Sequence, residues 1–285
     1  MLNQHGLKTC VIDTSFVYES PPLNGSNQPR YINVAASIET FLDPPDLLNL
    51  CKDIERKLGR REDDNKIRWS AREIDLDILF YENLNSSFTN QGRYLKIPHE
   101  GIKDRDFVLY PLNDLDSSFN HPVYNTSIAH MLQVYNKSNK SSSSAVKVLP
   151  VGRDRVLPLG KKTYIQGILN LTPDSFSDGA AYSTSTDNII YRALEMEEEG
   201  ADIIDVGGES TRPMAVPVSE EEELGRIIHV IQNLRKVLKH ETVISVDTYK
   251  SSVARIAIKE GADIINDISA GTRDENMLKT ARLYY

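Results

Sequence analysis

Short apolar runs alternate with longer amphipathic runs throughout the second half of the chain. Four short runs, each with the length of a buried strand, lie at residues 163–169, 202–206, 242–246 and 263–266. Three amphipathic runs with helical spacing lie near residues 187–199, 219–239 and 250–260. Buried strands that alternate with amphipathic helices are typical of a parallel α/β structure. We therefore predict a series of βα units, arranged as a parallel sheet or barrel.

An internal repeat supports this prediction. Residues 199–205 read EGADIID, and residues 260–266 read EGADIIN. In each copy a glycine follows a helical run and precedes an apolar run, so it is a suitable helix stop before a buried parallel strand.

The first half of the chain has a mixed pattern. Strands are predicted at residues 9–19, 30–40, 74–81 and 106–112. Residues 46–58 have helical periodicity with Gly59 as the stop, and the polar residues 82–93 are predicted to be a loop. A strong helix between strands indicates an α+β domain.

A serine-rich segment separates the two patterns. Residues 136–147 read NKSNKSSSSAVK and contain no large apolar residue except Val146. This composition is typical of a flexible linker. We predict a first domain at residues 1–135, a linker at residues 136–147 and a second domain at residues 148–285.

Two aspartates interrupt the apolar run IDLDIL. Because strand side chains alternate between faces, Asp75 and Asp77 leave one face while the apolar residues leave the other. Two carboxylates at this spacing, with Arg68 and Arg72 just upstream, suit Mg²⁺ and a polyphosphate. The alternative is an edge strand with one solvated face.

Polar residues also stand at the ends of the apolar runs in the second half. They are Asn170, Asp205, Asp247, Asn266 and Asp267. The carboxyl ends of parallel strands are where ligands bind in such structures. One such residue is explained as well by a helix cap or a loop start. Four strand ends in succession favour a binding site.

Composition limits the classes of function. The chain has 285 residues, enough for two domains, and its net charge of −8 argues against general nucleic-acid binding. No apolar run is long enough to span a membrane, and residues 1–10 lack the apolar segment of a secretory signal. Cys10 and Cys51 are too few for a disulfide framework and are predicted to be buried thiols. A basic cluster stands out against the acidic background, with Arg60, Arg61, Lys66, Arg68 and Arg72.

Longer motifs carry a resemblance to two enzyme families. The second half resembles dihydropteroate synthase, which joins a pterin diphosphate to p-aminobenzoate, at GILNLTPDSFSDG (167–179), IIDVGGESTRP (203–213), VISVDTYK (243–250) and IINDIS (264–269). The first half resembles 6-hydroxymethyl-7,8-dihydropterin pyrophosphokinase at residues 14–23, 28–40, 68–79 and 97–112. This order is that of fungal-type multifunctional folate biosynthesis proteins. The resemblance implies a ferredoxin-like α+β domain followed by the first half of a TIM (β/α)8 barrel.

For the first half, the resemblance implies Mg²⁺-dependent transfer of diphosphate from ATP to 6-hydroxymethyl-7,8-dihydropterin. Asp75 and Asp77 would hold Mg²⁺, and Arg60 and Arg72 would neutralise the transferring group. The implied ATP-binding residues are Glu55, Arg60, Arg72, Ile78, His99 and Arg105. Taken alone, His99 is more simply a histidine satisfied by its neighbours.

The resemblance also implies a pterin site in the first half. Its residues would be Ser20, Pro21, Leu23, Tyr31, Asn33 and Phe107. Tyr31 and Phe107 would stack on the flat ring, and Asn33 would pair with the ring edge. Without the flanking motifs, core packing is the preferred explanation for the two aromatic residues.

For the second half, the resemblance implies a binding site for pterin, p-aminobenzoate and diphosphate. Asn170 would be a Mg²⁺ ligand, and Asp247 and Asn266 would bind the pterin, with Asp205 as a supporting carboxylate. Thr211 and Arg212 would hold the diphosphate and p-aminobenzoate, and Asp178 would belong to a loop over the site. The protein's contribution would be charge stabilisation and positioning.

Both ends of the chain depart from these families. The pyrophosphokinase family opens with a strand and a Gly-Ser-Asn loop that this chain lacks, and four βα units are predicted where a closed barrel of this type has eight. Two hypotheses are therefore open. The chain is a functional piece of a folate enzyme, or it is a non-catalytic fragment or scaffold that binds pterin or a partner without turnover.

The expected partners are small molecules. They are ATP, 6-hydroxymethyl-7,8-dihydropterin and its diphosphate, and p-aminobenzoate, with no nucleic acid and no membrane. A homo-oligomer is compatible with the full-length protein. The expected location is the cytoplasm or the mitochondrion, with no targeting segment within this chain.

Overall fold

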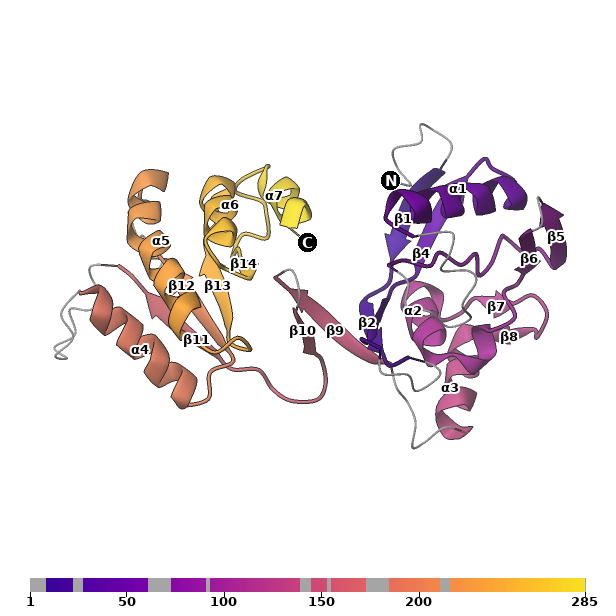
Figure 1. The fold of residues 1–285 in the computed structure, drawn as a ribbon, viewed down its shortest axis with the longest axis horizontal. Coiled ribbons are helices and arrows are strands. Elements are labelled where there is room, and N and C mark those ends of the chain that lie inside the picture. The colour runs from indigo at the N-terminus through magenta and orange to yellow at the C-terminus, as the bar shows by residue number, and fades with distance from the viewer. Residues whose placement is uncertain are drawn as a thin grey trace. The chain divides into compact units, whose positions relative to one another are not determined.

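The chain forms two compact units, residues 1–148 and 149–285 (Figure 1). The computed structural model describes residues 9–22, 28–60, 73–90, 93–138, 145–152, 155–172, 185–210 and 216–284. The chain passes from the first unit to the second within strand β9 (Val146–Val151).

The first unit contains short antiparallel strands. β1 (Thr9–Thr14) pairs with β4 (Ala36–Thr40), and β2 (Val17–Ser20) pairs with β3 (Tyr31–Asn33) and with the first residues of β9. These strands confirm the predictions over residues 9–19 and 30–40, although each predicted strand is divided in two.

Helix α1 (Pro44–Lys57) confirms the helix predicted over residues 46–58. It begins where the Asp43 carboxylate accepts a hydrogen bond from the Asp46 N–H at 2.9 Å, with Pro44 at the first helical position. It ends before Gly59, whose φ of 105° is the left-handed conformation of the predicted stop. Its apolar face lies in one core made of Leu47, Leu48, Leu50, Cys51, Ile54, Ile78, Leu95 and Ile97.

Two predictions between residues 74 and 93 are wrong in part. Residues 74–78 alternate in exposure as expected, but residues 79–81 do not, and the segment 74–81 belongs to no sheet among the described residues. The predicted loop over 82–93 contains most of a hairpin, β5 (Ser86–Asn90) with β6 (Arg93–Ile97). Phe88 pairs with Leu95 across this hairpin, and such cross-strand contacts stabilise a strand whose serine and asparagine content suggests a loop.

The strand predicted over residues 106–112 is wrong, because these residues begin helix α2 (Asp106–Asp116). Phe107, Val108 and Tyr110 have strand propensity, but tertiary contacts override it. Leu109 is completely buried, and the buried Asp106 carboxylate accepts a hydrogen bond from the Ala145 N–H at 3.0 Å.

Helix α3 (Ile128–Ser138) packs against α2. A 3-10 turn (Ile102–Asp104) and the short strands β7 (Asn120–His121) and β8 (Thr126–Ser127) complete the first unit. Both ends of the predicted linker lie in regular elements, since α3 continues to Ser138 and β9 begins at Val146.

The two cysteines differ in exposure. Cys51 is buried as predicted, and burial raises the pKa of its thiol to about 11. Cys10 is exposed, so that prediction is wrong. The reason is the alternation along β1, which buries Thr9 and turns the next side chain outward.

The second unit is built around four parallel strands. In sheet order they are β11 (Gln166–Asn170), β12 (Ile203–Gly207), β13 (Val243–Asp247) and β14 (Ile264–Asn266). The helices are α4 (Thr186–Glu198), α5 (Glu220–Val237), α6 (Ser251–Lys259) and α7 (Met277–Tyr284). Strand β10 (Arg155–Pro158) lies beside β9. The predicted alternation of strands and helices is confirmed.

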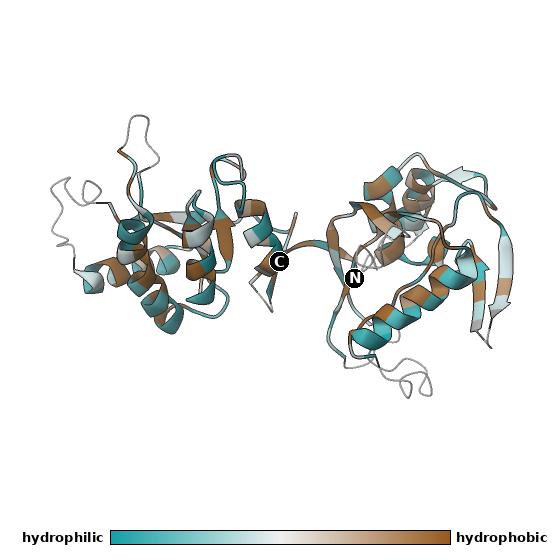
Figure 2. Cartoon of the chain, turned by 90° about the horizontal axis from the view of Figure 1, so that it is seen from above, coloured by the Kyte–Doolittle hydropathy of each residue, from teal (hydrophilic) through white to brown (hydrophobic). Residues whose placement is uncertain are grey.

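Helices cover one face of this sheet. Leu169, Ile204 and Val246 point to that face and share a core with apolar residues of α4, α5 and α6. The helices themselves carry both hydrophobic and hydrophilic residues (Figure 2). The other face carries Ile168, Asp205 and Ser245 in one row of the register. The face away from the helices therefore holds the polar residues.

Serines and glycines set the limits of the helices. Ser185 and Ser219 accept hydrogen bonds from backbone N–H groups in the first turns of α4 and α5. Gly200 and Gly261, from the two copies of the repeat, have φ of 106° and 120°, and this confirms their predicted role as helix stops.

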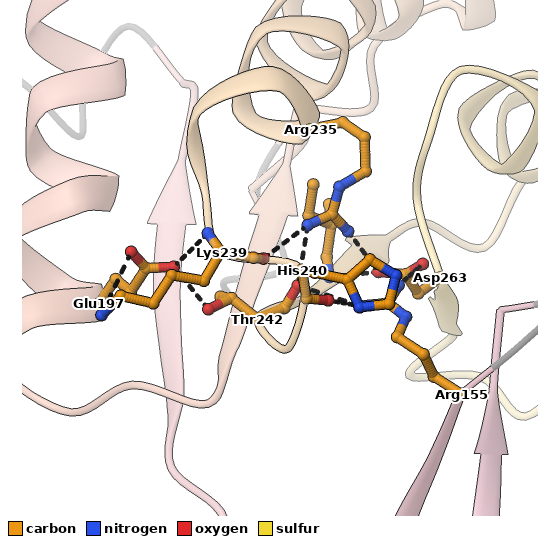
Figure 3. A network of polar contacts seen from close by, with 8 residues as sticks. Arg155, Glu197, Arg235, Lys239, His240, Thr242 and Asp263 are labelled. Atoms are coloured by element: carbon orange, nitrogen blue, oxygen red, sulfur yellow. Dashed lines mark hydrogen bonds and ion pairs between the residues drawn. The ribbon is translucent and has the colours of Figure 1, made fainter.

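A polar network ties several elements together at the amino ends of the strands (Figure 3). The Asp263 carboxylate pairs with Arg155 of β10 and with Arg235 of α5, at 3.0 Å for the latter. It also accepts a hydrogen bond from the Ile244 N–H at 2.9 Å. Arg235 donates to the Thr242 carbonyl at 3.1 Å as well. Asp263 therefore joins β10, α5 and β13 to β14.

Asp263→Asn is expected to destabilise the second unit by about 2–4 kcal/mol, because it removes the negative charge that pairs with the guanidinium groups of Arg155 and Arg235. Hydrogen exchange of the β13 and β14 amides in the intact chain measures this loss. The control is Asp187→Asn, which removes an exposed carboxylate from the first turn of α4 and should change stability by less than about 0.5 kcal/mol. Equal effects of the two substitutions would contradict the role assigned to Asp263.

Candidate functional site

The Asp75–Asp77 pair lies on the exposed side of its segment. The side chains are 43% and 44% exposed, while Leu76 is half-buried and Ile78 is packed in the α1 core. The predicted separation of carboxylates from apolar residues is therefore confirmed, although the segment belongs to no sheet among the described residues.

Glu55 connects this segment to α1. Its carboxylate is 1% exposed and accepts hydrogen bonds from Lys52 at 2.7 Å, from Arg60 at 2.5 Å and from the Leu76 N–H at 2.7 Å. Arg60 donates to Asp75 as well, at 2.7 Å. Burial lowers the pKa of Arg60, but the hydrogen bonds to Asp75 and Glu55 outweigh it, so the pKa is raised overall. The Glu55 carboxylate thus orients a cation and a backbone group beside the aspartates.

Glu55→Ala should destabilise the first unit by about 3 kcal/mol, since it leaves Lys52 and Arg60 beside an empty buried position. The measurements are the thermal unfolding of the chain and the hydrogen exchange of the α1 amides in the folded state. Asp53→Ala is the matched control on the same helix: its carboxylate is 48% exposed and pairs with the exposed Arg56, so the expected loss is below about 1 kcal/mol. A loss for Glu55→Ala that does not exceed the control would overturn this assignment.

The other described residues that were predicted to bind ATP are His99, Arg105 and Ile78. His99 Nε2 is 3.9 Å from an Asp77 oxygen, while its Nδ1 accepts a hydrogen bond from the Gly101 N–H at 3.1 Å. Arg105 lies over the Phe107 ring at 5.9 Å. Ile78 is 8% exposed, so its side chain belongs mainly to the core.

The pterin candidates of the first unit gather around β3. The Asn33 side-chain amide donates to Ser20 Oγ at 3.0 Å and to the Tyr31 carbonyl at 3.1 Å. The Tyr31 hydroxyl donates to Gln28 at 2.5 Å. Helix α2, which carries Phe107, contacts β3, and Pro21 directly follows β2. The structure therefore brings Ser20, Tyr31 and Asn33 together and places Phe107 on a helix that contacts β3.

In the second unit, the strand ends form one row. Asn170, Gly207, Asp247 and Asn266 are consecutive partners in the parallel register. A Cβ on Gly207 would lie 3.2 Å from Asn170 Oδ1 and 3.6 Å from Asp247 Oδ2. The glycine thus leaves room for the two polar side chains beside it. The predicted meeting of these strand-end residues is confirmed.

Asp205 lies on β12 two residues before Gly207, and it is 4% exposed. Its Oδ2 accepts a hydrogen bond from the Asn266 amide at 3.0 Å, and its Oδ1 has no hydrogen-bond partner among the described residues. Asp205 thereby fixes the orientation of the Asn266 amide.

Asp247 has a strongly shifted acidity. Burial is the largest cause, and together with the neighbouring carboxylates it raises the pKa of Asp247 to about 6. These carboxylates are those of Asp205, Glu223, Asp267 and Glu209. A carboxyl group that titrates near pH 6 can act either as an acceptor or as a donor toward a nitrogen-rich ring.

Sequence reasoning missed a second polar group beside this row. Lys250 pairs with Glu223 at 2.5 Å and with Glu209, and the Tyr249 hydroxyl donates to Glu209 at 3.1 Å. Glu223 is 1% exposed although it lies in the acidic run 220–223. Its helical spacing to the buried Ile227 is the signal that could have separated it from its exposed neighbours.

Five predicted site residues lie outside the described residues. They are Leu23, Arg72, Asp178, Thr211 and Arg212. Their assignments stay predictions.

No group of three or more His, Cys, Asp and Glu side chains among the described residues is arranged to hold a metal. Asp75 and Asp77 do offer two hard oxygen donors on an accessible surface, which suits Mg²⁺ because this ion keeps water and substrate phosphates as further ligands. No helix in the described part of the chain is long and apolar enough to cross a membrane.

Two family models match the chain in tandem. The model of 7,8-dihydro-6-hydroxymethylpterin-pyrophosphokinase (HPPK) matches residues 1–117, and the model of pterin binding enzymes matches residues 166–285. The chain therefore combines an HPPK domain with a pterin-binding domain of the TIM-barrel type. It belongs to the family of fused folate synthesis proteins.

Similar proteins support this membership. The chain is 43% identical over 285 residues to the mitochondrial folate synthesis bifunctional protein of Arabidopsis thaliana, covering 95% of this chain and 49% of that protein. It is 41% identical over 272 residues to folic acid synthesis protein fol1 of Schizosaccharomyces pombe, covering 95% of this chain and 34% of the relative. The chain thus spans about half the length of the first of these relatives and a third of the second.

A solved structure shows the same fold. It is the Plasmodium falciparum HPPK-DHPS with pterin and p-hydroxybenzoate, which matches with a TM-score of 0.68 and 24% identity. The match covers 94% of this chain and 63% of that chain.

Proposed function

We propose that this chain acts in folate biosynthesis through two consecutive transfers. The first unit transfers diphosphate from ATP to 6-hydroxymethyl-7,8-dihydropterin, and the second condenses the product with p-aminobenzoate to dihydropteroate. The observation that carries the proposal is the exposed Asp75–Asp77 pair with Arg60 held against it by the buried Glu55. The names of the relatives, which are folate synthesis proteins, support it.

In the first transfer, the pterin hydroxymethyl oxygen attacks the β-phosphorus of ATP, and the bond from that phosphorus to the α–β bridging oxygen breaks to release AMP. Asp75 and Asp77 would hold Mg²⁺, which when bound neutralises phosphate charge. Arg60, with Arg72, would stabilise the transferring group through charged hydrogen bonds. Glu55, His99, Arg105 and Ile78 would border the nucleotide.

The pterin ring would lie at β3 during this step. Tyr31 and Phe107 would stack on its faces, and Asn33 would pair with its edge. The hydrogen bond from Asn33 to Ser20 supports this role, because it fixes the amide before a ligand arrives. Pro21 and Leu23 would complete the contacts.

In the second transfer, the aryl amine attacks the methylene carbon of the pterin diphosphate, diphosphate departs, and the amine loses a proton. Asp247 and Asn266 would bind the pterin, with Asn266 oriented by Asp205. Thr211 and Arg212 would hold the diphosphate and p-aminobenzoate, with Asp178 on a neighbouring loop. Asn170 would supply an oxygen for Mg²⁺ beside the departing diphosphate.

The finer fold description is part of this proposal. We propose a ferredoxin-like arrangement for residues 1–135, a linker at residues 136–147 and half of a (β/α)8 barrel for residues 148–285. The four parallel strands with helices on one face support the barrel assignment. The proposed location is the cytoplasm or the mitochondrion, supported by the mitochondrial relative.

The test is a pair of assays on the full chain. With ATP, Mg²⁺ and 6-hydroxymethyl-7,8-dihydropterin, we expect AMP and the pterin diphosphate in equal amounts. With the pterin diphosphate and p-aminobenzoate, we expect dihydropteroate and inorganic diphosphate. No AMP in the first assay, with pterin binding retained, would instead support a non-catalytic fragment or scaffold.

A further inference from the structure

The loop after β12, residues 208–210, lies directly against helix α5. A Cβ on Gly208 would lie 2.8 Å from Ile227 Cγ2 and 3.0 Å from Glu223 Cγ, so the backbone approaches the helix as closely as glycine allows. Arg226 of the same helix donates a hydrogen bond to the Gly208 carbonyl at 2.6 Å. The loop is thus attached to the first turns of α5.

Lys250 provides a second attachment, from the other side of the loop. Its ammonium group pairs with Glu223 of α5 at 2.5 Å and with Glu209 of the loop, and it is 11% exposed. The Tyr249 hydroxyl donates to the same Glu209 carboxylate at 3.1 Å. Glu209 is therefore held by two consecutive residues that follow β13.

The charge balance makes this attachment difficult to break. Glu223 is 1% exposed, and its Oε1 has no hydrogen-bond partner among the described residues. Lys250 is therefore the cation that compensates this carboxylate in the described part of the chain. Removing the ammonium group would leave two carboxylates facing each other with little access to water.

We propose that Glu209, Glu223 and Lys250 form a latch that positions the loop after β12 for the diphosphate end of the substrate. The described part of this loop ends at Ser210, and the proposed diphosphate residues Thr211 and Arg212 follow it in the sequence. The three latch residues are positioning residues, because they contact one another and the neighbouring residues contact the substrate. This inference rests on the synthase step of the proposed function.

The latch has a specific consequence for ligand binding. Asp247 and Asn266, the proposed pterin residues, pair with each other at the ends of β13 and β14, outside the loop. A loosened latch should therefore weaken binding of the pterin diphosphate and leave binding of the pterin alone nearly unchanged. A general loss of structure would weaken both.

The test compares these two ligands on the full chain at pH 8, where Asp247 is ionised. Dissociation constants of 6-hydroxymethyl-7,8-dihydropterin and of its diphosphate are measured for the wild type and for Lys250→Met. We expect the diphosphate ligand to bind about ten- to a hundredfold more weakly to Lys250→Met, with less than about a twofold change for the pterin. Lys250→Arg should restore most of the loss, because a guanidinium group can bridge both carboxylates.

Two further variants separate the latch from simple charge or folding effects. Lys259→Met removes an exposed lysine from the same region of the chain and should leave both constants unchanged. Tyr249→Phe keeps the charges and removes one hydrogen bond to Glu209, so it should weaken the diphosphate ligand by about threefold to tenfold. Tyr249→Phe also tests the latch if Lys250→Met does not fold.

Hydrogen exchange gives a readout that needs no ligand. In Lys250→Met and Tyr249→Phe, the amides of residues 208–210 should exchange faster while those of β13 do not. Equal weakening of both ligands, or unchanged exchange in the loop, overturns the latch. If the wild type binds neither ligand, the proposed synthase function fails, and the exchange experiment still decides whether the latch holds the loop.

Discussion

Asp77→Asn is expected to reduce the pyrophosphokinase turnover of the full chain by about a thousandfold or more, because it removes one charged oxygen donor from the proposed Mg²⁺ site. Asp75→Asn should have a similar effect, and it also removes the carboxylate that pairs with Arg60. The measurement is the initial rate of AMP formation at saturating ATP, repeated over a range of Mg²⁺ concentrations.

The folded state should survive the Asp77 substitution, because that side chain is 44% exposed and its ion-pair partner among the described residues is His99, at 3.9 Å. Asp53→Asn, at an exposed position on α1, is the matched control and should retain the wild-type rate. If Asp77→Asn keeps more than about a tenth of the wild-type rate at every Mg²⁺ concentration, the carboxylate pair is not the metal site of this reaction.

Asp247→Asn is expected to stabilise the second unit at pH 8 and to abolish most of its pterin binding. The folded-state pKa of Asp247 is raised to about 6, above the ordinary aspartate value. Between pH 4 and 6 the folded protein therefore holds a proton that the unfolded chain has lost, so the free energy of unfolding falls as the pH rises through this window. Asparagine does not titrate and avoids this loss.

The stability gain should be near zero at pH 4 and should reach its full size above about pH 6. Two pKa units correspond to about 3 kcal/mol, and partial access of water to Asp247 reduces the expected gain to about 1–2 kcal/mol. Hydrogen exchange of the β13 and β14 amides at pH 4.5 and pH 8 measures it. A variant that is less stable than the wild type at pH 8 would contradict the raised pKa.

Pterin binding should change in the opposite direction. The ionised carboxylate accepts hydrogen bonds from ring N–H groups, whereas the asparagine amide presents donors as well. We expect the pterin to bind about a hundredfold more weakly to Asp247→Asn at pH 8. Such a gain in stability with a loss of binding is common where a site keeps a strained or uncompensated charge.

Local patterns predicted most of the second unit because each βα unit carries its own signals. The repeat around Gly200 and Gly261 places the helix stops, and the apolar runs that follow are buried on the helix-facing side. The strand-end residues Asn170, Asp247 and Asn266 then meet because parallel strands bring equivalent ends to one edge.

The first unit was less predictable because distant contacts decide its elements. Residues 106–112 have strand propensity, yet Asp106 binds the Ala145 backbone and Leu109 is buried against α3, so the segment is helical. The hairpin at β5 and β6 depends on cross-strand pairs such as Phe88 with Leu95, which polar composition conceals.

Among the site residues, the alternation at Asp75 and Asp77 could be read directly, whereas the partners of Glu55 could not. Glu55 lies on a helix and accepts the Leu76 N–H from a segment 21 residues away. Glu223 and Lys250 are 27 residues apart and were missed for the same reason. Pairings over such separations depend on the tertiary fold, which no local pattern encodes.

Gly207 has a consequence for the size of anything that binds at the strand ends. Adjacent strands are about 4.8 Å apart, so Asn170 and Asp247, two strands apart, are separated by about 10 Å at their backbones. Gly207 stands between them without a side chain, and both polar groups lean over it. The sheet itself therefore limits the space at the strand ends, because the methyl group of an alanine at position 207 would lie 3.2 Å from Asn170 Oδ1 and 3.6 Å from Asp247 Oδ2.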